Sequence, residues 1–278
     1  MSRYPSKILL FGEYAIIHES MALAIPYPGF YAEWKIQPQK HATDKFASYL
    51  DDMEVEDILF DYSLYQMDQE QSLHLITNIP QGYGVGSSGA LTAAFFERYI
   101  IRSKELSIVE LQSLFAQMES FFHGSSSGFD PLISYLNKGV IIDPRKKPKV
   151  IDQSQRKKYV FYLINSRKHR ETSPLVHLYL EKYKDPSFKT TIDHLSALNK
   201  KAIAAYVDDQ PQLIDIFKEI SALQRVAFKD MILPEMTDPF AILDLKLCGA
   251  GGGGYYLGIT DRTDIPELIS KHDIILLE

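Results

Sequence analysis

The 278-residue chain is poor in cysteine and tryptophan, with one of each. The single cysteine, Cys248, excludes a disulfide within the chain and is typical of a reducing compartment, so we expect a cytoplasmic protein. A long apolar run is also missing. The run ILLFGEYAII near the N-terminus is too short to span a bilayer and contains Glu13, so neither a signal peptide nor a transmembrane helix is expected.

Positive charge is in short supply as well. The 30 Lys and Arg residues are outnumbered by 36 Asp and Glu, and the net charge of −6 argues against a nucleic-acid partner. The basic cluster RKKPK at 145–149 is interpreted as a solvated linker rather than a binding arm.

The remaining composition is that of a folded protein, because 45% hydrophobic residues suffice for a core. We expect strands within residues 1–40, then a helix and a strand within 41–75. The Pro-flanked sequence near 144–155 indicates a boundary. The chain is therefore divided into an N-terminal lobe, residues 1–150, and a C-terminal lobe, residues 151–278.

The most informative segment is PQGYGVGSSGALT, residues 80–92. Its glycines Gly82, Gly84 and Gly86 permit positive φ and a close approach of the backbone to a ligand, and Ser87 and Ser88 add hydroxyls. The following ALTAAFFERYIIR is rich in helix formers, so the loop is expected to open a buried helix whose N-terminus attracts an anion.

Two common nucleotide motifs do not fit this segment. No Lys-Ser or Lys-Thr follows the last glycine, which excludes a Walker loop. A dinucleotide fingerprint is disfavoured because position 87 is Ser and no acidic residue ends a second strand about 20 residues further on. An ordinary Gly/Ser turn remains the alternative.

A second glycine cluster, LKLCGAGGGG at 245–254, lies between two β-type runs. This order predicts a strand, a glycine loop and a second strand, with the loop lying against a ligand or against the first loop. A flexible hairpin is the alternative, although a tight turn needs fewer glycines.

Acidic residues stand in MESFFHGSSSGFDP, residues 118–131. The capping box SIVE at 107–110 and the helical spacing of apolar residues predict a helix that ends near Gly124. Glu119 in its last turns is unfavourable near the helix C-terminus unless a cation such as a metal compensates it. The alternatives are a solvated surface Glu and, for Asp130, a helix N-cap.

Three motifs in order make the chain resemble the GHMP small-molecule kinases: SKILLFGEYAII, PQGYGVGSSGA and LKLCGAGGGG. The segment ESFFHGSSSGFD is similar to that of the mevalonate kinase branch, whereas the galactokinase sequence expected after Glu13 is missing. The resemblance implies a two-lobed α+β fold, with an N-terminal lobe like domain 2 of ribosomal protein S5 and a ferredoxin-like C-terminal lobe.

The same resemblance implies the roles of the polar residues. Asp130 takes the place of the catalytic base and Lys7 that of the lysine which stabilises charge between nucleophile and γ-phosphate. Without the motif, Lys7 would be interpreted as a solvated residue before a strand. Ser88 and Glu119 correspond to the residues that hold Mg²⁺.

Other positions correspond to ligand contacts. Ser87 and the glycines of both clusters would bind the phosphates of ATP; these glycines are Gly82, Gly84, Gly86, Gly249, Gly251 and Gly252. Three residues would contact the acceptor: Glu13, Tyr14 and His123. The sequence departs from the family pattern at Tyr14, where His is common, and at Ser126, where Pro is common. Gly89 replaces the usual Ala, at a cost in helix propensity of up to about 1 kcal/mol.

The function implied is ATP-dependent phosphorylation of the primary hydroxyl of mevalonate to 5-phosphomevalonate, in isoprenoid precursor synthesis. Two alternatives stay open: a kinase for another acceptor, such as phosphomevalonate or a sugar, and a non-catalytic nucleotide-binding regulator. We expect the small-molecule acceptor and ATP as partners, with no nucleic acid and no membrane. The sequence leaves the oligomeric state open, a homodimer being one option.

Overall fold

The structure, a computed structural model, describes residues 2–37, 43–152, 158–169, 172–264 and 274–277. The chain forms two compact units that interleave along the sequence. The first unit comprises 1–7, 26–80 and 85–138, and the second comprises 8–25, 81–84 and 139–278. The division differs from the expected boundary at residue 150, because residues 8–25, 81–84 and 139–150 fall in the second unit.

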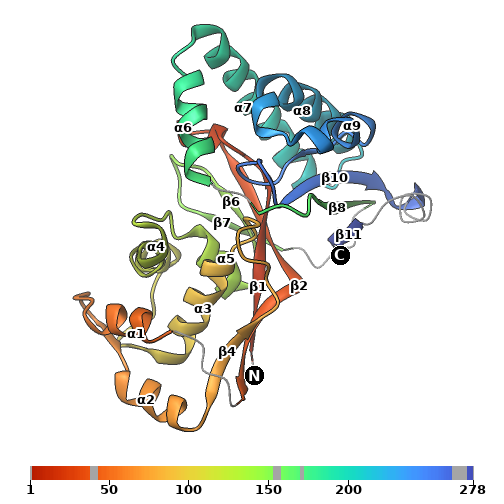
Figure 1. The fold of residues 1–278 in the computed structure, drawn as a ribbon. Coiled ribbons are helices and arrows are strands. Elements are labelled where there is room, and N and C mark those ends of the chain that lie inside the picture. Colours follow the sequence, from red (N-terminus) through yellow and green to blue (C-terminus); the bar gives the residue numbers. More distant parts are fainter. Residues whose placement is uncertain (1, 38–42, 153–157, 170–171, 265–273, 278) are drawn as a thin grey trace. The chain divides into compact units, whose positions relative to one another are not determined.

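The strands β1 (Arg3–Phe11) and β2 (Ala22–Ile36) are each divided between the two units. Among the described residues, the other elements of the first unit are three strands and five helices: α1 (Asp44–Asp51), β3 (Ile58–Phe60), α2 (Tyr62–Glu70), β4 (Leu73–Thr77), α3 (Ser87–Tyr99), β5 (Ile100–Arg102), α4 (Ile108–His123) and α5 (Phe129–Leu136). In Figure 1 these elements run from orange to yellow-green.

Helix α3 forms where the sequence predicts it, but it ends earlier. The expected helical run continues to Arg102, whereas α3 ends at Tyr99 and residues 100–102 form β5, paired antiparallel with β3. Two successive β-branched residues, Ile100 and Ile101, favour this extended conformation.

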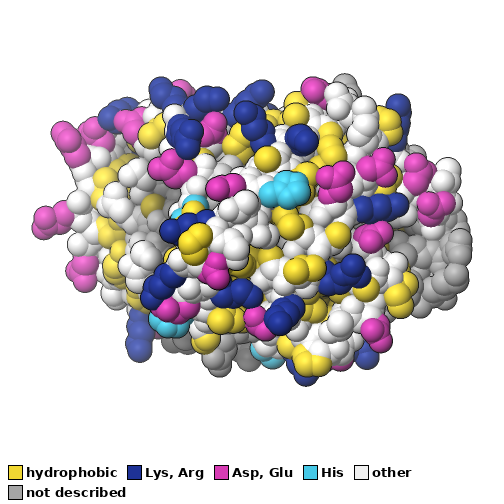
Figure 2. All heavy atoms as spheres, turned by 90° about the horizontal axis from the view of Figure 1, so that it is seen from above, with side chains coloured by type: hydrophobic (Ala, Val, Ile, Leu, Met, Phe, Trp, Pro, Cys, Tyr) yellow, Lys and Arg dark blue, Asp and Glu magenta, His cyan; other side chains and the backbone are white. Residues whose placement is uncertain are grey.

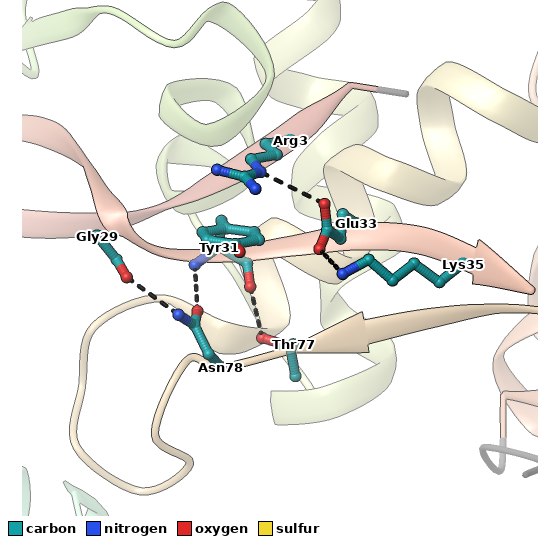
Figure 3. Close-up of polar contacts among 7 residues, drawn as sticks. All are labelled: Arg3, Gly29, Tyr31, Glu33, Lys35, Thr77 and Asn78. Atoms are coloured by element: carbon teal, nitrogen blue, oxygen red, sulfur yellow. Dashed lines mark hydrogen bonds and ion pairs between the residues drawn. The ribbon is translucent and has the colours of Figure 1, made fainter. Parts of the chain in front are cut away.

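The β2–β4 pairing is fixed at the end that leads into the glycine loop. Asn78 accepts a hydrogen bond from the backbone N–H of Tyr31 (2.7 Å) and donates one to the carbonyl of Gly29 (3.0 Å), as Figure 3 shows. Thr77 donates to the carbonyl of Tyr31 at 3.1 Å. Glu33 pairs with Arg3 at 3.3 Å and with Lys35 at 2.5 Å. Strand β4 is thus held in register immediately before residue 80.

Aromatic side chains fill the core of the first unit. Phe95 and Tyr99 on α3 meet Trp34 of β2 and Tyr65 of α2, with ring centroids 5.3–6.0 Å apart. Helix α4 begins at the predicted capping box, where both hydrogen bonds between Ser107 and Glu110 are present. It ends at the left-handed Gly124, so this prediction is confirmed.

The second unit contains an antiparallel sheet of order β11-β8-β10-β9 and several helices. Its elements are η1 (Ala15–His18), β6 (Gly139–Ile142), β7 (Lys149–Ile151), β8 (Tyr159–Asn165), α6 (Thr172–Lys182), α7 (Pro186–Val207), α8 (Leu213–Ala227), η2 (Lys229–Met231), η3 (Pro234–Met236), α9 (Thr237–Ile242), β9 (Lys246–Leu247), β10 (Tyr255–Asp261), η4 (Arg262–Asp264) and β11 (Ile274–Leu277). The rings of Phe11, Phe161 and Phe217 meet in its core.

The basic cluster at 145–149 is not a linker. It forms the connection of an antiparallel hairpin, because β6 pairs with β7 in the register Gly139↔Ile151 and Ile141↔Lys149. Asp143 shapes the turn with two hydrogen bonds. Its side chain accepts the backbone N–H of Arg145 at 3.1 Å, and its carbonyl accepts the backbone N–H of Lys146 at 2.9 Å. The exposed lysines therefore stand on an ordered support.

Both units combine helices with antiparallel strands, which confirms the predicted α+β class. On the face drawn in Figure 2, acidic and basic side chains are interspersed. None of the helices within the described residues has the length and apolar content needed to cross a bilayer.

Candidate active site

Lys7 and Asp130 form an ion pair in the first unit, with 2.8 Å between Nζ and Oδ1. Lys7 lies on β1 and its N–H donates to the carbonyl of Val85 at 2.9 Å. Asp130 is the second residue of α5, whose N-cap is Gly128, so Asp130 is not itself the cap. The Lys7 side chain is only 13% exposed, which argues against a solvated lysine. Asp130 is 31% exposed and can therefore reach a ligand.

The N-terminus of α3 lies next to this pair. Its N-cap, Gly86, has φ +79° and carries no side chain that could cap the first N–H groups of the helix. A Cβ on Gly86 would lie 3.2 Å from the Cβ of Lys7 and 3.6 Å from Oδ2 of Asp130. Helix N-termini bind anions through these N–H groups and the helix dipole. A phosphate bound here would lie close to both Lys7 and Asp130.

Gly89, in the first turn of α3, packs directly on the backbone of α5. A Cβ at this position would lie 2.7 Å from the carbonyl carbon of Asp130 and 2.8 Å from its Cβ. The two helices therefore approach more closely than an Ala would allow. This contact explains why Gly replaces the usual Ala, a departure for which the sequence offered only a cost in propensity.

We predict that Gly89→Ala lowers the free energy of unfolding by about 1–3 kcal/mol, because the new methyl group clashes with the backbone of Asp130. Ala improves helix propensity by up to about 1 kcal/mol, which does not offset a backbone clash. Urea unfolding of the variant and the wild type measures this difference. Equal stability of the two proteins would contradict the tight α3–α5 contact.

Ser88 and Glu119 also meet in the first unit. The Ser88 hydroxyl donates to Oε1 of Glu119 at 2.9 Å and lies 3.0 Å from Nε2 of His123. Ser126 donates to Oε2 of Glu119 at 2.5 Å and accepts the N–H of Gly128 at 3.0 Å. The hydroxyl of Ser126, where Pro is common, thus holds the carboxylate of Glu119. His123 was predicted to contact the acceptor, and here it lies against Ser88.

The electrostatics of Glu119 favour a bound cation. The residue is 4% exposed, so it is not a solvated surface Glu. Burial and, to a lesser extent, the charge of Asp130 raise the pKa of Glu119 to about 7. Within the described part of the chain, no three His, Cys, Asp or Glu side chains cluster as a metal site. A hydroxyl and one carboxylate nevertheless suit Mg²⁺, which retains waters and takes other ligands from phosphates.

In the second unit, Glu13 is fully buried and paired with Lys246. The ammonium of Lys246 also donates to the carbonyl of Leu247 at 2.8 Å, and Gln224 accepts the Leu247 N–H at 2.9 Å. Burial raises the pKa of Glu13, and the charge of Lys246 opposes this shift. Glu13 was predicted to orient the acceptor. That role stays a prediction, and the ion pair joins the motif SKILLFGEYAII to β9, which lies within the motif LKLCGAGGGG.

We predict that Lys246→Met lowers the free energy of unfolding by about 3–5 kcal/mol, because Glu13 is left as an unpaired buried carboxylate. Burial raises the pKa of Glu13 in the folded state, so the folded state binds more protons than the unfolded state above the ordinary pKa of a glutamate. The variant should therefore lose stability as pH rises. Urea unfolding at mildly acidic and mildly alkaline pH measures both effects. The matched double variant Glu13→Gln/Lys246→Met should recover part of the loss.

Tyr14 connects the same two motifs. Its hydroxyl donates to the carbonyl of Ala250 at 2.6 Å, and its ring stacks on Tyr179 with centroids 4.7 Å apart. The residue has φ +58°, a conformation that is uncommon for a bulky side chain and is retained where the surroundings impose it. Tyr14 is therefore held in place by contacts within the second unit.

The glycines predicted to bind phosphates divide between the units. Gly82 and Gly84 lie in the second unit, and Gly86 begins the helix in the first. Near Gly82, the His169 ring nitrogen Nδ1 lies 3.1 Å from the carbonyl of Gln81. In the third motif, Gly252 donates its N–H to Met231 at 2.7 Å, so this group is used within the protein. Gly249, Gly251 and Ser87 remain predicted contacts.

Lys246 and Ser126 are the polar residues that the sequence prediction missed. Lys246 had a detectable signal, because it is the one charged residue in the apolar run LKLC. Ser126 was noted as a departure from the family pattern, but its bond to Glu119 depends on the path of the loop from 124 to 128.

Residues 55–138 match the family described as GHMP kinases N terminal domain. No curated protein sequence matches the chain. Solved structures that are similar over nearly the whole chain include three kinases with different acceptors. The mevalonate kinase of Methanococcus jannaschii has a TM-score of 0.70 and 18% identity, covering 99% of this chain and 96% of its own. The phosphomevalonate kinase of Streptococcus pneumoniae, in complex with phosphomevalonate and AMPPNP, has a TM-score of 0.68 and 15% identity, covering 100% of this chain and 98% of its own.

The galactokinase of Lactococcus lactis, complexed with galactose, is also similar, with a TM-score of 0.63, 14% identity and coverage of 99% and 91%. These similarities show that the chain has the GHMP kinase fold. Kinases with different acceptors match at comparable levels, so the likeness does not distinguish between acceptors.

Proposed function

We propose that this protein with the GHMP kinase fold transfers the γ-phosphoryl group of ATP to the primary hydroxyl of mevalonate. One observation carries the proposal: the α3 N-terminus, the Lys7–Asp130 pair and the Ser88–Glu119 pair gather within a single compact unit. An anion-binding helix end, a base with a cation and a hydroxyl–carboxylate pair are the parts that phosphoryl transfer needs.

The proposed reaction assigns a step to each group. A carboxylate oxygen of Asp130 accepts the proton of the acceptor hydroxyl while the hydroxyl oxygen attacks the γ-phosphorus. The bond between the γ-phosphorus and the bridging oxygen breaks, and that oxygen leaves with ADP. The ammonium of Lys7, 2.8 Å from Asp130, stabilises the negative charge between the attacking oxygen and the phosphoryl group. The first N–H groups of α3 bind the phosphate oxygens.

The metal is assigned to Ser88 and Glu119. Ser126 orients Glu119 and His123 orients Ser88, each through a hydrogen bond. When bound, Mg²⁺ would offset the charge of the β- and γ-phosphates. Gly82, Gly84, Gly249 and Gly251, which lie in the second unit, stay sequence predictions of phosphate contacts.

A kinase for a different acceptor is the second candidate. It is favoured by the similar TM-scores of the mevalonate and phosphomevalonate kinases and by Tyr14, which stands where His is common in mevalonate kinases. A regulator that binds a nucleotide without catalysis is disfavoured, because the Lys7–Asp130 and Ser88–Glu119 pairs are both formed.

The acceptor is tested by turnover of Mg²⁺ and ATP with mevalonate, phosphomevalonate and galactose under identical conditions. We expect mevalonate to have the highest kcat/KM, by at least about tenfold. Preference for phosphomevalonate or galactose would replace mevalonate as the acceptor and leave the assigned catalytic groups in place. ATP binding without turnover of any acceptor would favour the regulator.

A further inference from the structure

The basic hairpin at 145–149 borders a cavity that has no residue in common with the candidate active site. Two adjoining cavities, of about 460 and 430 Å³, share Met21, Asp143, Lys146 and Lys200. The second is formed by the β6–β7 hairpin and the last turns of α7, all within the second unit. We call this second cavity the hairpin groove. Its volume falls within the range of about 300–1,000 Å³ that is typical of small-molecule sites.

One side of the hairpin groove is apolar. Ile141 of β6 and Ile203 of α7 line it and are 7% and 2% exposed, and Val207 at the end of α7 is 38% exposed. Covering this surface removes apolar area from water, which favours a ligand with a hydrocarbon portion. A bare inorganic anion would leave that area uncovered.

The other side carries an excess of positive charge. Four lysines and two aspartates line the groove. Lys146 pairs with Asp143 at 3.4 Å, whereas Lys147, Lys149 and Lys200 form no ion pair with any other described residue. These three ammonium groups are exposed in a protein of net charge −6, so the groove concentrates charge opposite to that of the whole chain.

From this combination we propose that the hairpin groove binds a small organic anion with an apolar chain, of the phosphate monoester class. The terminal phosphate oxygens accept hydrogen bonds from Lys147, Lys149 and Lys200, and the chain lies on Ile141, Ile203 and Val207. The support is rigid for this purpose, because three lysines stand on a hydrogen-bonded hairpin and one helix. The proposal is independent of the phosphoryl transfer assigned to the first unit.

The test titrates the full chain with decyl phosphate below its micelle concentration, using isothermal calorimetry. We expect saturable binding that weakens with added salt, and at least about tenfold weaker binding of inorganic phosphate and of decanol, because each lacks one half of the recognised chemistry. Equal binding of inorganic phosphate would overturn the apolar part of the proposal, and equal binding of decanol would overturn the ionic part.

Variants locate the site. Lys147→Gln/Lys149→Gln/Lys200→Gln should weaken decyl phosphate binding at least about tenfold, since all three charges are lost. Lys201→Gln, at the next and likewise exposed position of α7, is the matched control and should bind normally. Val207→Asn tests the apolar side without touching a charge and should also weaken binding. Unchanged affinity in the triple variant would overturn the proposal, whatever the kinase assays show.

Discussion

Asp130→Asn is expected to lower the turnover number by at least about 100-fold, the scale of losing a general base, while ATP affinity stays nearly unchanged. An amide is the same size as a carboxylate but cannot accept the proton of the acceptor hydroxyl. The substitution also leaves the mostly buried ammonium of Lys7 without its carboxylate partner, so the thermal midpoint should be compared with that of the wild type. Turnover and nucleotide binding should be measured on the same preparation.

The matched control for this variant is Asp52→Asn, an exposed aspartate of the first unit at the C-terminal end of α1. It should behave as the wild type in both assays. Normal turnover of Asp130→Asn would remove Asp130 as the base. An equal loss in both variants would attribute the effect to the unit as a whole.

Lys7→Met is expected to lower the turnover number by about 100-fold to 1,000-fold, the scale of removing one group that stabilises charge in a transition state. Methionine retains the length and much of the volume of the lysine stem. The Lys7 side chain is mostly buried beside Gly86, so removing its charge leaves the α3 N-terminus without its neighbouring cation. The loss should appear in kcat more than in the affinity for ATP.

Two further variants separate chemistry from stability for Lys7. Lys7→Arg keeps the positive charge, so it should recover part of the activity that Lys7→Met loses. The recovery should be incomplete, because the planar guanidinium has a different geometry from the ammonium. The double variant Lys7→Met/Asp130→Asn should be only slightly slower than either single variant, since residues that act as a unit are not additive. Fully multiplicative losses would contradict a joint role.

Local signals in the sequence were sufficient for the elements around the site. Helix α4 begins after the capping box at Ser107 and ends at Gly124 in both the prediction and the structure, because each cap is made by neighbouring residues. The glycine-rich loop likewise opens α3. Lys7 and Asp130, which are far apart in sequence, were assigned to one site only through the family resemblance, and the structure places them 2.8 Å apart.

Features that depend on contacts between distant segments were not predicted. The end of α3 at Tyr99 depends on the pairing of β5 with β3, and the partner of Glu13 lies more than two hundred residues away at Lys246. The basic segment 145–149 was interpreted as a linker from its charge alone, whereas backbone pairing of β6 with β7 makes it a hairpin. The charges of these side chains indicate that the segment is exposed to solvent, but they do not determine whether its backbone pairs with a neighbouring strand.

Phosphoryl transfer from ATP to an alcohol is the central claim, and it is tested most directly by following the γ-phosphate itself. The protein is incubated with mevalonate, Mg²⁺ and ATP labelled at the γ-position with ¹⁸O, and the products are analysed by mass spectrometry. We predict labelled 5-phosphomevalonate and ADP in equal amounts, with neither formed by Asp130→Asn above about one hundredth of that rate. Label found only in inorganic phosphate, or no ADP at all, would contradict the claim.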